Sequence, residues 1–211
     1  MPSTNSRATQ PVEGTLVRIR DDGRVLELPY DGAMTLHAGS FWWGTAVGFR
    51  AMQAAAQALS TDELWSRDQL YVVSAHPGPG VRDSINYITR TVDRNRFKCV
   101  EDAECGGRCH SSMKFEWWVS DATRTVAVRL RPDFVPASFY ELSDRLGLPD
   151  TTAADKLAFE IFKVNLSSRI WSAPLAESFR VEVSNAPLAV GEIPTPVQAA
   201  NYWERTYETA R

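Results

Sequence analysis

The three cysteines of this 211-residue chain lie in one short run, with a histidine directly behind the last of them: Cys99, Cys105, Cys109 and His110. An odd number of cysteines leaves one thiol over in any disulfide framework. The run therefore favours metal or redox chemistry over structural disulfides, and the fold has to rest on a hydrophobic core. Because 44% of the residues are hydrophobic, the chain is long enough to bury one sizeable core.

Composition excludes several classes of partner. Charged residues make up 23% of the chain, the formal net charge is -3 and the pI is about 5.7, so no basic excess points to nucleic acid. No run approaches the roughly 20 apolar residues that a membrane span needs, so no membrane partner is expected. The first ten residues are polar and contain no apolar signal region, which predicts a cytoplasmic protein.

The hydrophobic patterning mixes helices with strands without a run of strand–helix–strand units, and this predicts an α+β fold. Residues 1–14 are expected to be disordered, and residues 16–20 and 25–28 to form a hairpin around an Asp-Gly turn. The remaining strands are predicted at 70–74, 114–119, 125–130 and 179–183. Helices are predicted at 44–59, 81–91 and 153–171, and a further short helix is predicted to begin at the capping box of residues 60–63. In the last helix Leu157, Ile161 and Val164 line one face, and Phe159, Phe162, Leu166 and Ile170 widen it.

The cysteine run is a moderate signal for a metal. Zinc takes four nitrogen or sulfur ligands in structural sites and three plus water in catalytic ones. The spacing of Cys105 and Cys109 is one residue longer than the usual C-x₂-C, and Cys109 and His110 are neighbours whose side chains project in different directions. A zinc or iron site would therefore use Cys99, Cys105 and Cys109 with a distant fourth ligand, His76 or His37.

Three other interpretations of the run stay open. A histidine directly after a cysteine is what haem attachment requires, but the run is one residue longer than C-x-x-C-H. Non-covalent haem could instead be ligated by His110 or a cysteine, with Trp42 beside the macrocycle. Cys105 and Cys109 could also form a reversible disulfide, so the alternative function is a haem-binding or thiol redox-sensing protein that uses Cys105, Cys109 and His110. Finally, the three thiols could be reduced and without a ligand.

Two further segments carry candidate binding groups. A Gly/Pro loop at 76–80 leads from a predicted strand into a helix, and the amides at that helix start could hold an anion with help from Arg82. The structural alternative is an ordinary turn with Asp83 in the first helical turn, where the helix dipole favours it. The adjacent Trp42 and Trp43 could form a pocket in which the ring of a ligand stacks. The simpler alternative is that both side chains pack in the hydrophobic core.

These segments occur in the order of a known family. Residues 37–51, the stretch from Gly80 to Asp83, the strands around Lys114 and Arg129, and residues 170–181 resemble motifs of the FmdE family, which is named after a component of formylmethanofuran dehydrogenase. The resemblance covers about residues 35–185. It implies an FmdE-like mixed sheet packed against helices at 35–190, with a cysteine-rich insert at 97–112, an N-terminal extension at 1–34 and a tail at 191–211. Family members are often dimers, so the resemblance also implies a homodimer.

The departures from the family bear on function. Ser40, Trp42 and Gly80 stand where the family has its metal-binding His and Cys residues, whereas Asp83 and Lys114 match positions around its cleft. The hypothesis is a relocated metal site, serving a metal-dependent enzyme that acts on a small molecule near the cysteine run. In it, Asp83 and Lys114 act as acid/base or anion-binding groups. The reaction is not named by the sequence, and formylmethanofuran dehydrogenase activity is not inferred.

Overall fold

The computed structural model describes residues 14–37, 42–61, 63–104 and 109–204. It confirms the predicted mixture of helices and strands, in which a two-stranded hairpin precedes a five-stranded mixed sheet covered by helices. The expected disorder at the N-terminus concerns residues that, apart from Gly14, lie outside the described part of the chain.

The hairpin is formed by β1 (Leu16–Asp21) and β2 (Arg24–Pro29). Asp22 and Gly23 have φ values of 47° and 73°, as the tight two-residue turn between twisted strands requires. Val17 and Ile19 face the core from β1, and the side-chain amide of Gln53 donates to the carbonyls of Gly14 and Leu16. The hairpin is therefore joined to the main body.

The main sheet has the strand order β4-β3-β5-β6-β7. Its members are β3 (Tyr71–Ser74), β4 (Phe97–Cys99), β5 (Glu116–Ser120), β6 (Thr125–Leu130) and β7 (Phe179–Ser184). The pair β3 and β4 is parallel and is joined through α3 (Pro79–Thr89), whereas all other pairs are antiparallel. One strand–helix–strand unit thus lies within an otherwise antiparallel sheet.

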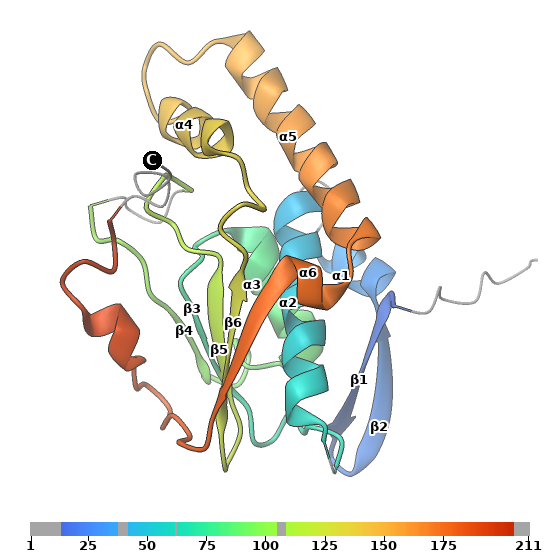
Figure 1. Ribbon diagram of the computed structural model, residues 1–211. Coiled ribbons are helices and arrows are strands. Elements are labelled where there is room, and N and C mark those ends of the chain that lie inside the picture. Colours follow the sequence, from blue (N-terminus) through green and yellow to red (C-terminus); the bar gives the residue numbers. More distant parts are fainter. Residues whose placement is uncertain (1–13, 38–41, 62, 105–108, 205–211) are drawn as a thin grey trace, which may run out of the picture.

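Each face of the sheet has its own covering layer (Figure 1). On the inner face, Val72, Trp117 and Val128 pack in the main core with the helices. On the outer face, Tyr71, Val73 and Trp118 are covered by the C-terminal segment, which contains a short 3₁₀ turn (Thr195–Gln198). The helices are α1 (Tyr30–Leu36), α2 (Trp42–Leu59), α3, α4 (Ala137–Arg145), α5 (Ala153–Ser172) and α6 (Leu175–Ser178).

The backbones of α2 and α3 approach closely at two glycines of α2. A Cβ atom added to Gly48 would lie 2.4 Å from Ser84 Oγ and 3.1 Å from both Cα and O of Val81. A Cβ on Gly44 would lie 3.4 Å from the Val81 nitrogen. Because side chains are absent at both positions, the first turns of the two helices lie side by side.

Several local predictions were wrong. No helix follows Ser60 in the described residues, because the Ser60 hydroxyl accepts a hydrogen bond from the Trp65 amide, five residues on, and stabilises a loop. Leu157, Ile161 and Val164 are all more than half exposed, since α5 packs through its other apolar face, which includes Leu166 and Ile170. Helices α1 and α4 and strand β4 had not been predicted at all.

The glycine contact generates a stability prediction. Gly48→Ala should destabilise the protein by about 1–3 kcal/mol, because the new methyl group overpacks the contact between α2 and α3. Adding Ser84→Ala should recover only part of this loss, since the contacts with the Val81 backbone remain. Urea unfolding of the single variant, the double variant and the wild type measures both effects. Equal stability of Gly48→Ala and the wild type would contradict the packing described.

Candidate functional site

A small cavity lies between the first turns of α2 and α3 and the helices α4 and α5. Its volume is about 130 Å³. We call it the Lys163 cavity, and it is lined by Trp43, Gly44, His76, Gly78, Pro79, Gly80, Cys109, Met113, Phe139, Phe159 and Lys163. The wall is apolar except for three side chains, namely His76, Cys109 and Lys163. An apolar cavity with a few converging polar groups is the usual form of a small-molecule site.

His76 is placed by the loop that joins β3 to α3. Its ring nitrogen Nδ1 accepts a hydrogen bond from the Gly78 amide at 3.0 Å, and its ring lies 4.5 Å from that of Phe115, centroid to centroid. Burial, with a smaller contribution from His110, lowers the pKa of His76 to about 3. The ring is therefore neutral at physiological pH, and because Nδ1 is an acceptor, the proton resides on Nε2.

The absence of a side chain at Gly78 leaves space beside His76 and Cys109. A Cβ at this position would lie 2.6 Å from Cε1 of His76 and 3.7 Å from Sγ of Cys109. Burial raises the pKa of the Cys109 thiol, and the charge of Lys163 opposes the shift. Cys109 is therefore a neutral thiol at neutral pH, which can donate or accept only a weak hydrogen bond.

The electrostatics of the cavity favour negative charge. The first turns of α2 and α3 both contribute to the wall, and no side chain caps the start of α3, where Pro79 is the first helical residue. Lys163 is 6% exposed and pairs with the more exposed Glu160, which is not part of the lining. Helix N-termini carry partial positive charge, and this adds to the lysine charge. Among the described residues, no acidic side chain belongs to the lining.

Trp43 lines the same cavity. The residue is 3% exposed, and its indole N–H is buried with no hydrogen-bond partner among the described residues. Leaving such a donor unsatisfied costs about 1–3 kcal/mol. The opposite side of the ring packs in the core, where it stacks on Phe134 with 6.0 Å between ring centroids.

The structure distributes the predicted site residues over separate places. His37, at the end of α1, donates from Nδ1 to the Asp83 carboxylate on α3. His110 Nδ1 accepts the Ser112 amide at 3.1 Å. The Lys114 ammonium donates to the Glu204 carbonyl at 2.6 Å. None of the predicted residues in these three contacts belongs to the lining of the Lys163 cavity.

The remaining predicted residues divide in the same way. Trp42 is 43% exposed at the start of α2, while its neighbour Trp43 lines the cavity. Arg82 and Cys99 line a separate pocket of about 320 Å³ on the other side of His76, and desolvation is the main cause that raises the pKa of Cys99 to about 11. Cys105 lies outside the described residues. Lys163 had not been predicted, although it stands out as a lysine on an apolar helix face.

The metal hypothesis finds little support in these contacts. Within the described residues, no three His, Cys, Asp or Glu side chains gather as metal ligands. A histidine that binds a metal normally donates a hydrogen bond from its other ring nitrogen. In both His76 and His110 the Nδ1 atom accepts a backbone N–H instead, so neither fits ligation through Nε2. A metal and haem therefore both remain predictions from the sequence.

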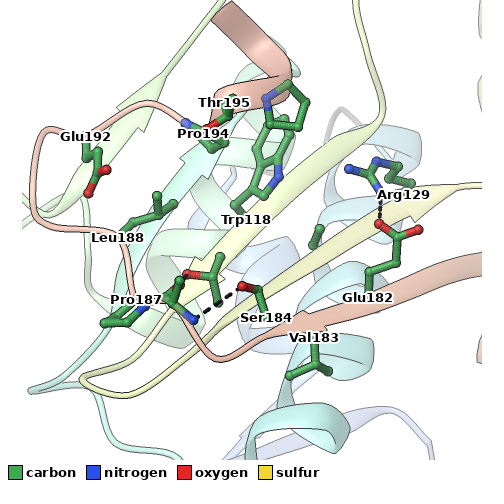
Figure 2. Close-up of a pocket in the computed structure, with 14 residues that line it drawn as sticks. Trp118, Arg129, Glu182, Val183, Ser184, Pro187, Leu188, Glu192, Pro194 and Thr195 are labelled. Atoms are coloured by element: carbon green, nitrogen blue, oxygen red, sulfur yellow. Dashed lines mark hydrogen bonds and ion pairs between the residues drawn. The ribbon is translucent and has the colours of Figure 1, made fainter.

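A larger groove of about 410 Å³ lies between β6, β7 and the C-terminal segment (Figure 2). Its charged groups are already engaged, because Arg129 pairs with both Glu116 and Glu182. Burial raises the pKa of Glu116, whereas the Arg129 pair and the Tyr202 hydroxyl, which donates at 3.0 Å, oppose the shift. The charged groups of the groove are therefore paired with one another, whereas the wall of the Lys163 cavity is mostly apolar.

Comparison with known proteins adds no further evidence on the function of this site. No protein-family model matches the chain, and no curated protein matches it. Among the described residues, no helix has the length and apolar character to cross a membrane.

The pKa of His76 generates a prediction for stability against pH. In the unfolded chain the imidazole takes up a proton below about pH 6.5, but in the folded chain only near pH 3. Between these two pH values the unfolded chain binds one proton more than the folded chain. The free energy of unfolding is therefore highest above about pH 6.5 and decreases as the pH is lowered. The slope contributed by this group approaches about 1.4 kcal/mol per pH unit.

His76→Gln tests this assignment, because the amide oxygen keeps an acceptor for the Gly78 N–H and does not titrate. We expect the free energy of unfolding to depend less steeply on pH between 6 and 5 in the variant. Urea unfolding at several pH values measures the slope. Identical slopes in the two proteins would show that His76 is not the buried titrating group.

Proposed function

We propose that this protein binds a small monoanion with an apolar body, of the carboxylate class, in the Lys163 cavity. The observation that carries the proposal is the combination of a buried lysine and two helix starts around a mostly apolar wall, to which none of the described acidic side chains contributes. In a site from which water is largely excluded, such groups interact with an anion more strongly than they would in water.

The cavity limits the size of the ligand. At about 130 Å³ it is close to the apolar cavity of about 150 Å³ that accommodates benzene in an engineered protein. Trp43, Phe139 and Phe159 supply aromatic surface for a ligand of that size. The anionic group would accept hydrogen bonds from Lys163 and from Nε2–H of His76, because both are donors on the wall.

The proposal keeps part of the sequence hypothesis and leaves the rest as prediction. A small molecule bound beside the cysteine run remains the expected activity, because Cys109 lines the cavity. The FmdE-like ancestry, a catalytic role for Asp83 or Lys114, and a metal or haem remain proposals from the sequence. Metal analysis and an absorption spectrum of untagged protein test the cofactors, since stoichiometric zinc, iron or haem would support them.

The experiment uses benzoate and short-chain monocarboxylates as probes, each with its neutral amide. We expect carboxylates to bind more tightly than the amides by about tenfold or more, because a hydrogen bond to a charged group contributes about 1.5–3 kcal/mol. Lys163→Met should remove this preference while keeping the volume of the side chain. Calorimetry and quenching of tryptophan fluorescence measure the affinities.

Lys156→Met is the matched control, since Lys156 is an exposed lysine on the same helix and does not line the cavity. It should leave the preference for carboxylates unchanged. The proposal fails if the amides bind as well as the carboxylates, or if Lys163→Met and Lys156→Met behave alike.

A further inference from the structure

The far edge of the main sheet is formed by β7, which pairs with β6 on one side only in the described structure. After Phe179, every residue of the strand is exposed. Val181 and Val183 are 39% and 53% exposed, although they share the inner face with Val128 and Val126 of β6. An edge strand with exposed valines is a ready site for pairing with another strand.

The charges of β7 are complementary to those of a second copy of β7 that runs antiparallel to it. Arg180 and Glu182 lie on either side of Val181 and both face the outer side of the sheet, as Figure 2 shows for Glu182 beside Arg129. If two copies pair antiparallel about Val181, Arg180 of each lies opposite Glu182 of the other, and Phe179 lies opposite Val183. Opposite charges at directly facing positions stabilise a sheet, whereas like charges destabilise it.

We infer that β7 is a dimerisation strand, on which a second copy of this chain pairs antiparallel about Val181 to form a continuous ten-stranded sheet. Charge complementarity favours a second copy of this chain as the partner, because Arg180 of each copy faces Glu182 of the other. The arrangement is isologous and closes after two copies. It leaves β4, a strand of three residues, as the outer edge of each protomer.

The dimer changes the environment of groups already described. Glu182 pairs with Arg129 at 2.5 Å and with Arg180 at 2.8 Å in the same protomer. Because Arg129 also pairs with Glu116, the two arginines and two glutamates of this cluster balance, and the Arg180 and Glu182 of a second copy add one further charge of each sign. Arg180 has a side chain that is 70% exposed, and it forms an ion pair with Glu182. Its replacement therefore alters the proposed interface without removing a buried contact.

The test is sedimentation equilibrium of the full chain at low ionic strength. We expect a dimer for the wild type and for the charge-conserving control Arg180→Lys. In Arg180→Glu two attractive pairs become two repulsive ones, and the dissociation constant should rise by about tenfold or more. Added salt should weaken the wild-type dimer, because the pairs lie at the surface.

Crosslinking gives an independent readout of the register. Directly opposite residues of an antiparallel pair have Cα atoms about 4.5–5.5 Å apart, which lies within the range of a disulfide. Val181→Cys should therefore form a covalent dimer on mild oxidation, beyond any background of the wild type. Val190→Cys, at a more exposed position in the C-terminal segment, should not. The inference is overturned if the wild type is monomeric at 0.2 mM (about 5 mg/ml, from its 23.6 kDa). It is equally overturned if the dimer is insensitive to Arg180→Glu and Val181→Cys fails to crosslink.

Discussion

The close approach of α2 and α3 is the constraint on which the rest of the molecule depends. Gly44 and Gly48 remove two side chains from the contact, so the helices meet backbone to backbone and their first turns come level with each other. Helix α2 is buried over most of its length and contacts α1, α3, α5, β1, β6 and β7. A helix surrounded in this way cannot shift alone, because every neighbour would have to repack. The geometry of the Lys163 cavity therefore follows from packing.

The same packing accounts for the chemical character of the cavity. Burial keeps His76 neutral and Cys109 protonated, so neither brings a charge of its own to the wall. The positive potential comes from Lys163 and from backbone amides, whose partial charges do not titrate. A site built in this way holds its preference for anions over a wide range of pH. It also remains apolar enough to favour the body of a ligand, because Phe139 and Phe159 occupy the surface between the polar groups.

Sequence patterning predicted the elements that obey a local rule. The hairpin at Asp22 and Gly23 and the long helices α2 and α5 follow from turn chemistry and apolar content. The patterning failed where tertiary contacts decide: the Ser60 hydroxyl bonds to a loop amide, and α5 exposes an apolar stripe while it packs through another. The cavity joins residues 43, 76, 109 and 163, whose proximity no local spacing encodes. The predicted anion site at the start of α3 was assigned Arg82, whereas the cation on the cavity wall is Lys163, from a helix about eighty residues later.

The covering of the outer face has a consequence for synthesis. Tyr71 and Val73, on the first strand of the main sheet to be made, are buried by residues between Leu188 and Trp203. During translation these side chains stay uncovered until more than a hundred further residues have been added. The inner face can be covered earlier, since α2 precedes the sheet in the chain. The nascent protein thus passes through a stage with one finished face and one apolar face open to water, when premature contacts with other chains are most costly.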